Sequence, residues 1–171
     1  MKQFCLGVLS AVVAFSLLTF TYLWLGLAEV RTDVGPPRLE SSLMQMAVHA
    51  SVRRHAPELR NPIEPTDANL ISGAKMYLDE CSGCTGTPGR TPKWTNSLIP
   101  PAPQFAVTGT AYSEAQIFWV AKHGIRRTGM FGNGVWDSDQ KLWTMAAYVC
   151  RMRDLSPAVD EEVTNLAKGR E

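Results

Sequence analysis

The chain begins with a long stretch that carries no charge. Phe4 to Ala28 contains no Asp, Glu, Lys or Arg and is almost entirely apolar. A helix needs about 20 such residues to cross the hydrocarbon layer of a bilayer, because each residue advances it by only about 1.5 Å. The stretch is long enough, so residues 1–30 are predicted to form a transmembrane anchor.

A cleaved signal peptide is the alternative for this segment. The apolar part of a signal peptide is about 7 to 15 residues long and ends in a small-x-small cleavage site. The apolar part here is longer, and residues 23–30 (LWLGLAEV) offer no clean site of that kind. We favour a retained anchor, and cleavage stays open. Lys2 lies on one side of the segment and Arg31 and Arg38 on the other, so flanking charge does not decide the orientation.

Charge and cysteine content narrow the classes of function. The chain has 171 residues, a formal net charge of +1 and four cysteines. A nucleic-acid partner would require a concentrated basic patch to offset the phosphates, and the sequence has none. Four cysteines are too few for a disulfide scaffold, and Cys5 lies inside the apolar segment. A chain of this length suits one globular domain of modest size together with the N-terminal apolar segment and a linker.

Residues 31–66 are predicted to contain an amphipathic helix and a Pro-rich linker. A helical pattern runs from Arg38 to Leu59, and its apolar residues recur at i, i+4, i+7 and i+11, namely Leu39, Leu43, Met46 and Ala50. This face is expected to pack on the globular domain or on a partner subunit. His49 lies nearer to it than His55, and both histidines are expected to be exposed.

The globular domain is predicted to span residues 67–157. Thr66 suits the N-cap of a helix that runs to Cys81 and Cys84, with an apolar face that includes Tyr77. Residues 86–110 are rich in Gly and Pro and are predicted to be irregular. They also carry four large apolar side chains: Trp94, Leu98, Ile99 and Phe105. In an irregular surface loop these side chains would be exposed to solvent unless they packed against an apolar group such as a cofactor.

Two more helices are predicted after this loop. Ser113 and Gln116 have the spacing of a capping box, and Gly124 is suited to end that helix. Asp137 or Ser138 begins the last long helix, which is predicted to reach about Arg153. Residues 158–171 are predicted to be a polar tail.

The motif Cys81-Ser82-Gly83-Cys84-Thr85 carries the chemistry. C-x-x-C-H is the attachment signature of a c-type haem, in which two thiols form thioethers and the His becomes an axial iron ligand. The fifth position here is Thr85, whose neutral hydroxyl is a poor donor to iron. Downstream, Met130 lies in a Gly-rich turn, and a thioether is a soft ligand that favours ferrous iron.

From Asn69 to Leu155 the chain resembles the family of small, membrane-anchored, single-haem c-type cytochromes of bacteria. The residues that carry the resemblance are Gly73-Ala74-Lys75-Met76-Tyr77, the two cysteines, His123-Gly124-Ile125 and Thr128-Gly129-Met130. It implies an all-α fold: three main helices with long irregular loops, in which the helix containing Gly73 packs across the C-terminal helix. It also implies haem c as cofactor, bound by Cys81, Cys84 and Met130, with Met130 as the metal ligand. Thr85 occupies the position of the usual proximal histidine, so whether haem is attached in this protein stays an open question.

Two functions from different classes follow from the resemblance. The first is a membrane-tethered electron carrier, not an enzyme, with the soluble domain on the periplasmic or extracytoplasmic side and a redox protein or membrane complex as partner. An open axial site would add a weak peroxidase-like side activity, and a histidine such as His49 would be one way to fill it. The second is a haemless pseudo-cytochrome that serves as a structural subunit. A thiol oxidoreductase or zinc site ranks last, because the βαβ setting and the second pair of cysteines are missing.

Overall fold

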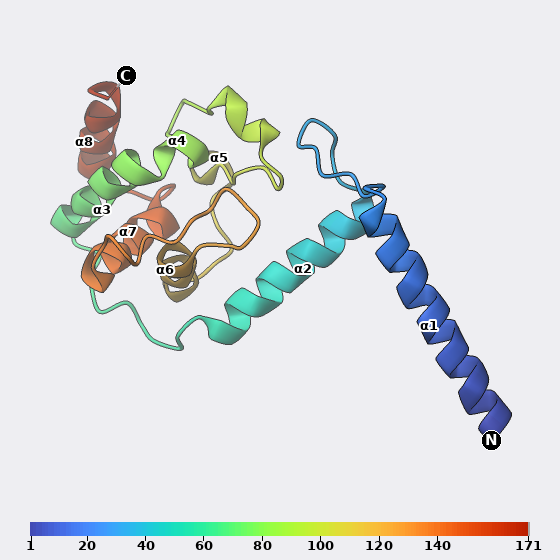
Figure 1. Ribbon diagram of the computed structural model, residues 1–171. Coiled ribbons are helices and arrows are strands. Elements are labelled where there is room, and N and C mark those ends of the chain that lie inside the picture. Colours follow the sequence, from blue (N-terminus) through green and yellow to red (C-terminus); the bar gives the residue numbers. More distant parts are fainter. Residues whose placement is uncertain (171) are drawn as a thin grey trace. The chain divides into compact units, whose positions relative to one another are not determined.

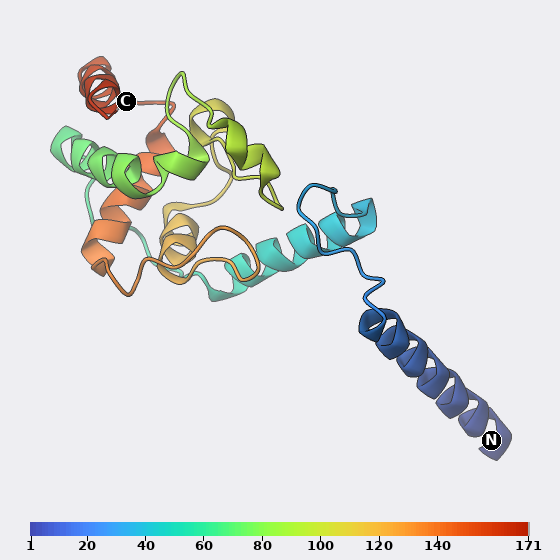
Figure 2. The same ribbon diagram turned by 45° about the horizontal axis from the view of Figure 1, so that its top comes forward.

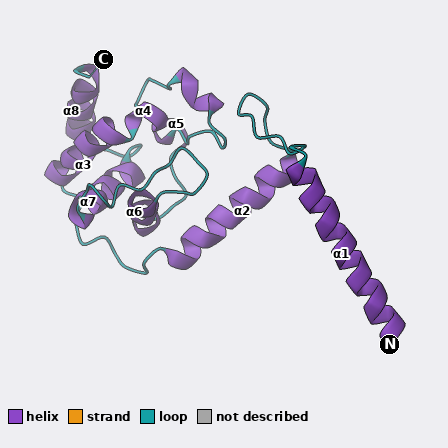
Figure 3. Cartoon of the chain, viewed as in Figure 1, coloured by secondary structure: helices purple, strands orange, loops and turns teal. Residues whose placement is uncertain are grey.

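The computed structural model describes residues 1–170, and every regular element in that range is a helix (Figure 3). The chain divides into two compact units, Met1–Pro36 and the part from Pro37 onward. The all-α prediction is therefore confirmed. The second unit contains both the amphipathic helix and the domain that follows it.

The first unit contains helix α1 (Lys2–Trp24). With 23 residues, α1 is about 34 Å long at 1.5 Å per residue. None of its residues is buried, and it is long and apolar enough to cross a membrane. The length and composition of a signal sequence would satisfy the same test.

The second unit is built around two crossing helices, α3 (Asp67–Glu80) and α7 (Asp139–Arg151), as Figures 1 and 2 show. Gly73 lies at the crossing. A Cβ atom added there would overlap the backbone carbonyl oxygen of Thr144. Only glycine permits this approach, so the close packing expected at Gly73 is confirmed.

Helix α6 (Glu114–His123) packs beside α7 and contributes further side chains to the core. Phe118 of α6 and Trp143 of α7 stack with their ring centroids 4.1 Å apart. The caps predicted from sequence are present: the side chain of Thr66 caps α3, Ser113 forms a capping box with Gln116, and Ser138 caps α7.

The prediction of a polar tail over residues 158–171 is wrong for the part that the structure describes. Helix α8 (Pro157–Lys168) contacts α3, and its Val159 and Val163 are fully buried in the core. The two valines are spaced i and i+4, which places them on one face of a helix. The acidic run Asp160–Glu162 masks this pair in the sequence. Residue 171 lies outside the described residues.

The prediction for the amphipathic helix needs two corrections. Helix α2 (Arg38–His55) ends before Leu59, because Ala56 adopts an extended conformation ahead of Pro57. The side chain that α2 buries is Val52, near its contact with α6, and not the predicted stripe. The large side chains of that stripe are exposed: Leu39, Leu43 and Met46.

The segment 86–110 is irregular as predicted, with two short helical turns inside it. These are the 3-10 helix η1 (Lys93–Ser97) and α5 (Phe105–Thr108). A single bridge joins Thr87 and Arg90. The segment leaves the short helix α4 (Ser82–Thr85), which follows α3 directly, and returns to the bundle at α6.

Candidate functional site

The two cysteines of the motif flank one turn of helix. Cys81 ends α3 and precedes α4, and Cys84 lies within α4. Both are free thiols, and Cys81 packs against the hydrophobic core. Burial raises the pKa of the Cys81 thiol to about 12, and the neighbouring Glu80 raises it further. A thiol with such a pKa is a poor nucleophile near neutral pH, so Cys81 is not an activated thiol.

Thr85, at the position of the usual iron-ligating histidine, is engaged inside the fold. Its Oγ1 lies 2.8 Å from the hydroxyl oxygen of Tyr77 and 2.8 Å from the carbonyl oxygen of Cys81. The Tyr77 hydroxyl in turn donates to the carbonyl oxygen of Gly86 at 2.7 Å. Tyr77 is fully buried, so these contacts connect the motif to the core. In this position Thr85 stabilises the turn and offers no nitrogen donor.

The Pro-rich loop folds back onto the motif through Gln104. Its Nε2 donates to the carbonyl oxygen of Cys84 at 3.1 Å and to that of Ala102 at 3.0 Å. Gly86 has φ 73°, and a Cβ atom there would lie 2.5 Å from Gln104 Oε1 and 2.7 Å from the carbonyl oxygen of Arg90. Gly86 therefore allows the loop to close directly against the end of α4.

Met130 lies in a turn that packs against the end of α6. Its backbone N–H donates to Thr128 Oγ1 at 3.0 Å, and its carbonyl accepts from the N–H of Ile125 at 2.8 Å. On the neighbouring Gly129, an added Cβ atom would lie 3.3 Å from a methyl carbon of Leu98. The Met130 turn therefore contacts the Pro-rich loop, and that loop contacts Cys84. The Met130 side chain is half-buried.

Apolar side chains of both loops remain in contact with solvent. Trp94 is 53% exposed, Phe131 61% and Trp136 73%. Leu98, Ile99 and Phe105 are only half-buried. Of these side chains only Phe105 packs against the helical core. Large apolar surface of this kind is uncommon unless it serves to bind something.

The three histidines lie along α2 and α6. His49 Nδ1 is 2.7 Å from the hydroxyl of Tyr112, whose carbonyl oxygen is 3.6 Å from Cys150 Sγ. His55 stacks on Trp119, and His123 at the end of α6 lies against the same indole. None of these contacts involves the cysteine motif.

The suggested use of His49 as a replacement ligand does not fit this arrangement. His49 is linked through Tyr112 to Cys150, near the C-terminal end of α7. Cys81 lies beside Glu80, whose carboxylate pairs with Lys141 near the N-terminal end of α7. Lys141 and Cys150 are nine residues apart, or about 13 Å along the helix axis. The structure therefore keeps His49 and Cys81 at opposite ends of α7.

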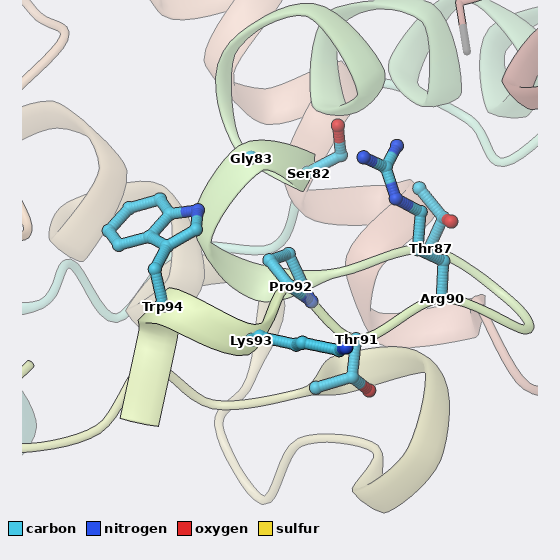
Figure 4. A pocket seen from close by; sticks show the side chains of 8 residues that line it. All are labelled: Ser82, Gly83, Thr87, Arg90, Thr91, Pro92, Lys93 and Trp94. Atoms are coloured by element: carbon cyan, nitrogen blue, oxygen red, sulfur yellow. The ribbon is translucent and has the colours of Figure 1, made fainter. Parts of the chain in front are cut away.

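A cavity of about 470 Å³ adjoins the other side of α4, and sequence reasoning did not anticipate it. Two cations, Arg90 and Lys93, line it together with hydroxyl groups such as that of Ser82. In Figure 4 the guanidinium of Arg90 points toward Ser82, with Trp94 on the opposite side. Neither the cysteines nor Met130 line this cavity. The only sequence signal was the pair of basic residues among the prolines and threonines of 87–94.

Comparison with known proteins adds no relative. No protein-family model, curated protein or solved structure matches this chain. Within residues 1–170, no three side chains of the His, Cys, Asp and Glu types come together in a metal-binding group. The candidates predicted from sequence are the two thiols, as points of haem attachment, and the thioether of Met130, as an iron ligand.

Proposed function

We propose that this chain is a membrane-tethered cytochrome c-like electron carrier, with α1 as the anchor and a haem attached through Cys81 and Cys84. The observation that carries the proposal is that the Pro-rich loop touches two segments that are far apart in sequence. Gln104 hydrogen-bonds to the carbonyl of Cys84, and Leu98 of the same loop touches Gly129, next to Met130. The Pro-rich loop therefore contacts both the attachment motif and the Met130 turn.

The residues present fit a haem at some positions and not at another. The two thiols sit one helical turn apart, as two thioether links require, and the loops provide half-exposed apolar side chains to cover a flat apolar group. Met130 supplies a soft thioether from a turn held by Thr128. The position of Thr85 supplies no nitrogen, because a threonine side chain carries only a hydroxyl, and that hydroxyl contacts Tyr77 and the carbonyl of Cys81.

When bound, the haem would supply one-electron chemistry, with a reduction potential raised by a thioether ligand. The chain's own residues would bind, orient and cover it. Cys81 and Cys84 would fix it to α4, Met130 would approach it from the turn after α6, and the apolar side chains of the two loops would exclude water. The near-neutral charge favours a redox partner in the same membrane over long-range electrostatic steering of a soluble one.

A haemless structural subunit is the second candidate, and one observation favours it. The hydroxyls of Thr85 and Tyr77 lie 2.8 Å apart, and each has a backbone carbonyl within donating distance, that of Cys81 for Thr85 and that of Gly86 for Tyr77. These contacts stabilise the motif without any cofactor. In such a protein Cys81 and Cys84 would remain thiols or form a disulfide.

Haem staining on a denaturing gel separates the two functions. The full chain is expressed with a cytochrome c maturation system, beside a Cys81→Ser/Cys84→Ser variant as control. Haem absorbance that stays on the wild-type band and is absent from the control supports the cytochrome. A colourless band with the mass of the apoprotein overturns it in favour of the haemless subunit.

Two substitutions test the axial positions if the band is coloured. Met130→Ala should abolish the sulfur-to-iron charge-transfer absorbance, and persistence of that absorbance would remove Met130 from the site. Thr85→His should convert the spectrum to low spin. An unchanged spectrum would mean that another ligand already fills the position.

A further inference from the structure

Helix α2 carries an apolar stripe that nothing in the described chain covers. Leu39 is 71% exposed, Met46 61% and Leu43 49%. Together with Ala50 they recur at intervals of four, three and four residues, so they lie within a narrow sector of the helix. Exposed apolar side chains aligned in this way, and not scattered singly, indicate a contact surface.

The way α2 attaches to the domain determines where the stripe faces. Its C-terminal half contacts α6, with Val52 buried and Val48 half-buried, and His55 stacked on Trp119. At about 100° per residue, Val48 lies about 140° around the helix from Leu43. The stripe therefore faces away from the domain that α2 packs on.

The sequence on the N-terminal side of α2 favours a lipid surface as the occupant. The apolar helix α1 ends at Trp24, and residues 25–37 connect it to the start of α2 at Arg38. Thirteen residues reach at most about 45 Å when fully extended. If α1 is anchored in a bilayer, as the proposed function requires, the start of α2 is tethered within about 45 Å of the end of α1, so α2 is able to reach the surface of that bilayer.

The basic residues beside the stripe also favour a lipid surface. Arg53 and Arg54 lie on either side of the sector, since they follow Ala50 by three and four residues, and Arg38 stands at the start of the helix. Long basic side chains at the edges of an apolar face can reach lipid headgroups while the face enters the interface. α2 contains one acidic residue, Glu40.

A partner helix is less suited than a lipid surface to cover the apolar stripe of α2. The apolar seam covers residues 39–50, which is fewer than two heptads, whereas coiled coils are recognised by three or four. The next position of the seam, three residues after Ala50, is the charged Arg53.

We propose that the outward stripe of α2 (Leu39, Leu43, Met46 and Ala50) rests on the membrane surface and holds the globular domain in a set orientation above it. The inference rests on the membrane anchor of the proposed function and not on the haem. On this basis α2 lies between the domain on one face and the lipid on the other.

Cysteine labelling in vesicles tests this proposal. Leu43→Cys is placed on the stripe, and Gln45→Cys, exposed and about 160° around the helix, is its matched control. Each full-length variant is reconstituted into vesicles containing about one quarter anionic lipid and treated with a membrane-impermeant maleimide. Mass spectrometry of the tryptic peptide 39–53 follows labelling of the new cysteine alone, because the native cysteines lie in other peptides.

The expected result is labelling at least tenfold slower for Leu43→Cys than for Gln45→Cys, at every protein-to-lipid ratio. Equal rates in protein that resists extraction at alkaline pH would overturn the proposal and leave the anchor intact. Loss of the protein on alkaline extraction would reject the anchor itself. Protection that disappears on dilution with lipid, or disulfide-linked dimers of Leu43→Cys, would assign the stripe to a second copy of the chain and also overturn the proposal.

Discussion

Two buried tyrosines provide a sharp test of how the motif is held to the core. Tyr77 and Tyr148 are both fully buried, and their ring centroids are 5.5 Å apart. The Tyr77 hydroxyl donates to Gly86 and lies 2.8 Å from Thr85 Oγ1. The Tyr148 hydroxyl has no hydrogen-bond partner among the described residues. Tyr77→Phe and Tyr148→Phe remove the same atom from two neighbouring sites, so each is the control for the other.

The expected effects have opposite signs. Tyr77→Phe leaves the carbonyl of Gly86 without its partner, and an unsatisfied buried polar group costs about 1 to 3 kcal/mol. Thr85 retains its contact with the carbonyl of Cys81, so we expect a loss of about 2 kcal/mol in the free energy of unfolding. Tyr148→Phe removes a hydroxyl that is buried without a partner, and stability should stay equal or rise by about 1 kcal/mol.

Urea unfolding of the full chain in a mild non-ionic detergent measures both effects. With a slope of about 1 to 3 kcal/mol per M for a domain of this size, 2 kcal/mol moves the midpoint by about 1 M. Tryptophan fluorescence and circular dichroism should report the same shift. Equal midpoints for the two variants, or a lower midpoint for Tyr148→Phe than for Tyr77→Phe, would refute the hydrogen-bond assignment.

The remaining predictions concern packing and pH. Gly73→Ala should lower stability by about 2 kcal/mol, because overpacking the α3–α7 crossing outweighs the better helix propensity of alanine, whereas Gly83→Ala, with open space around it, should change the urea midpoint little. Val163→Asp should release α8 and make it sensitive to limited proteolysis, and protection equal to that of the wild type would contradict the docking of α8. Burial raises the pKa values of Tyr77 and Tyr148 above 10, so the unfolded state loses these protons first. Stability should then fall above about pH 10 by up to about 1.4 kcal/mol per pH unit for each tyrosine, and unfolding midpoints that stay constant to pH 11 would contradict this.

Local signals in the sequence were sufficient for much of the helical framework. The caps at Thr66, Ser113 and Ser138 could be predicted because each depends on a side chain that bonds to backbone groups within three residues. The charge-free segment at the N-terminus was equally readable, because the length of a bilayer-crossing helix follows from its rise per residue. These are contacts or lengths that involve one stretch of chain at a time.

Helix faces were harder to assign, because burial depends on what lies opposite. The stripe of Leu39 and Leu43 has the regular spacing of a core face, yet α2 buries Val52 instead. In α8 the opposite error arose, since a charged surface concealed the fully buried Val159 and Val163. Periodicity identifies a face, and only the neighbouring helix determines whether that face is covered.

By itself, the sequence determined that this protein is helical, carries an apolar segment able to span a bilayer, and places two thiols one turn apart ahead of a long Pro-rich loop. Only the tertiary structure decided that Thr85 is engaged by Tyr77, that the loop returns to Cys84 through Gln104, and that His49 stands at the far end of α7. The physical reason is distance along the chain. Caps and helix lengths arise within a few residues, whereas these contacts require segments far apart in sequence to be brought together by packing around α3 and α7.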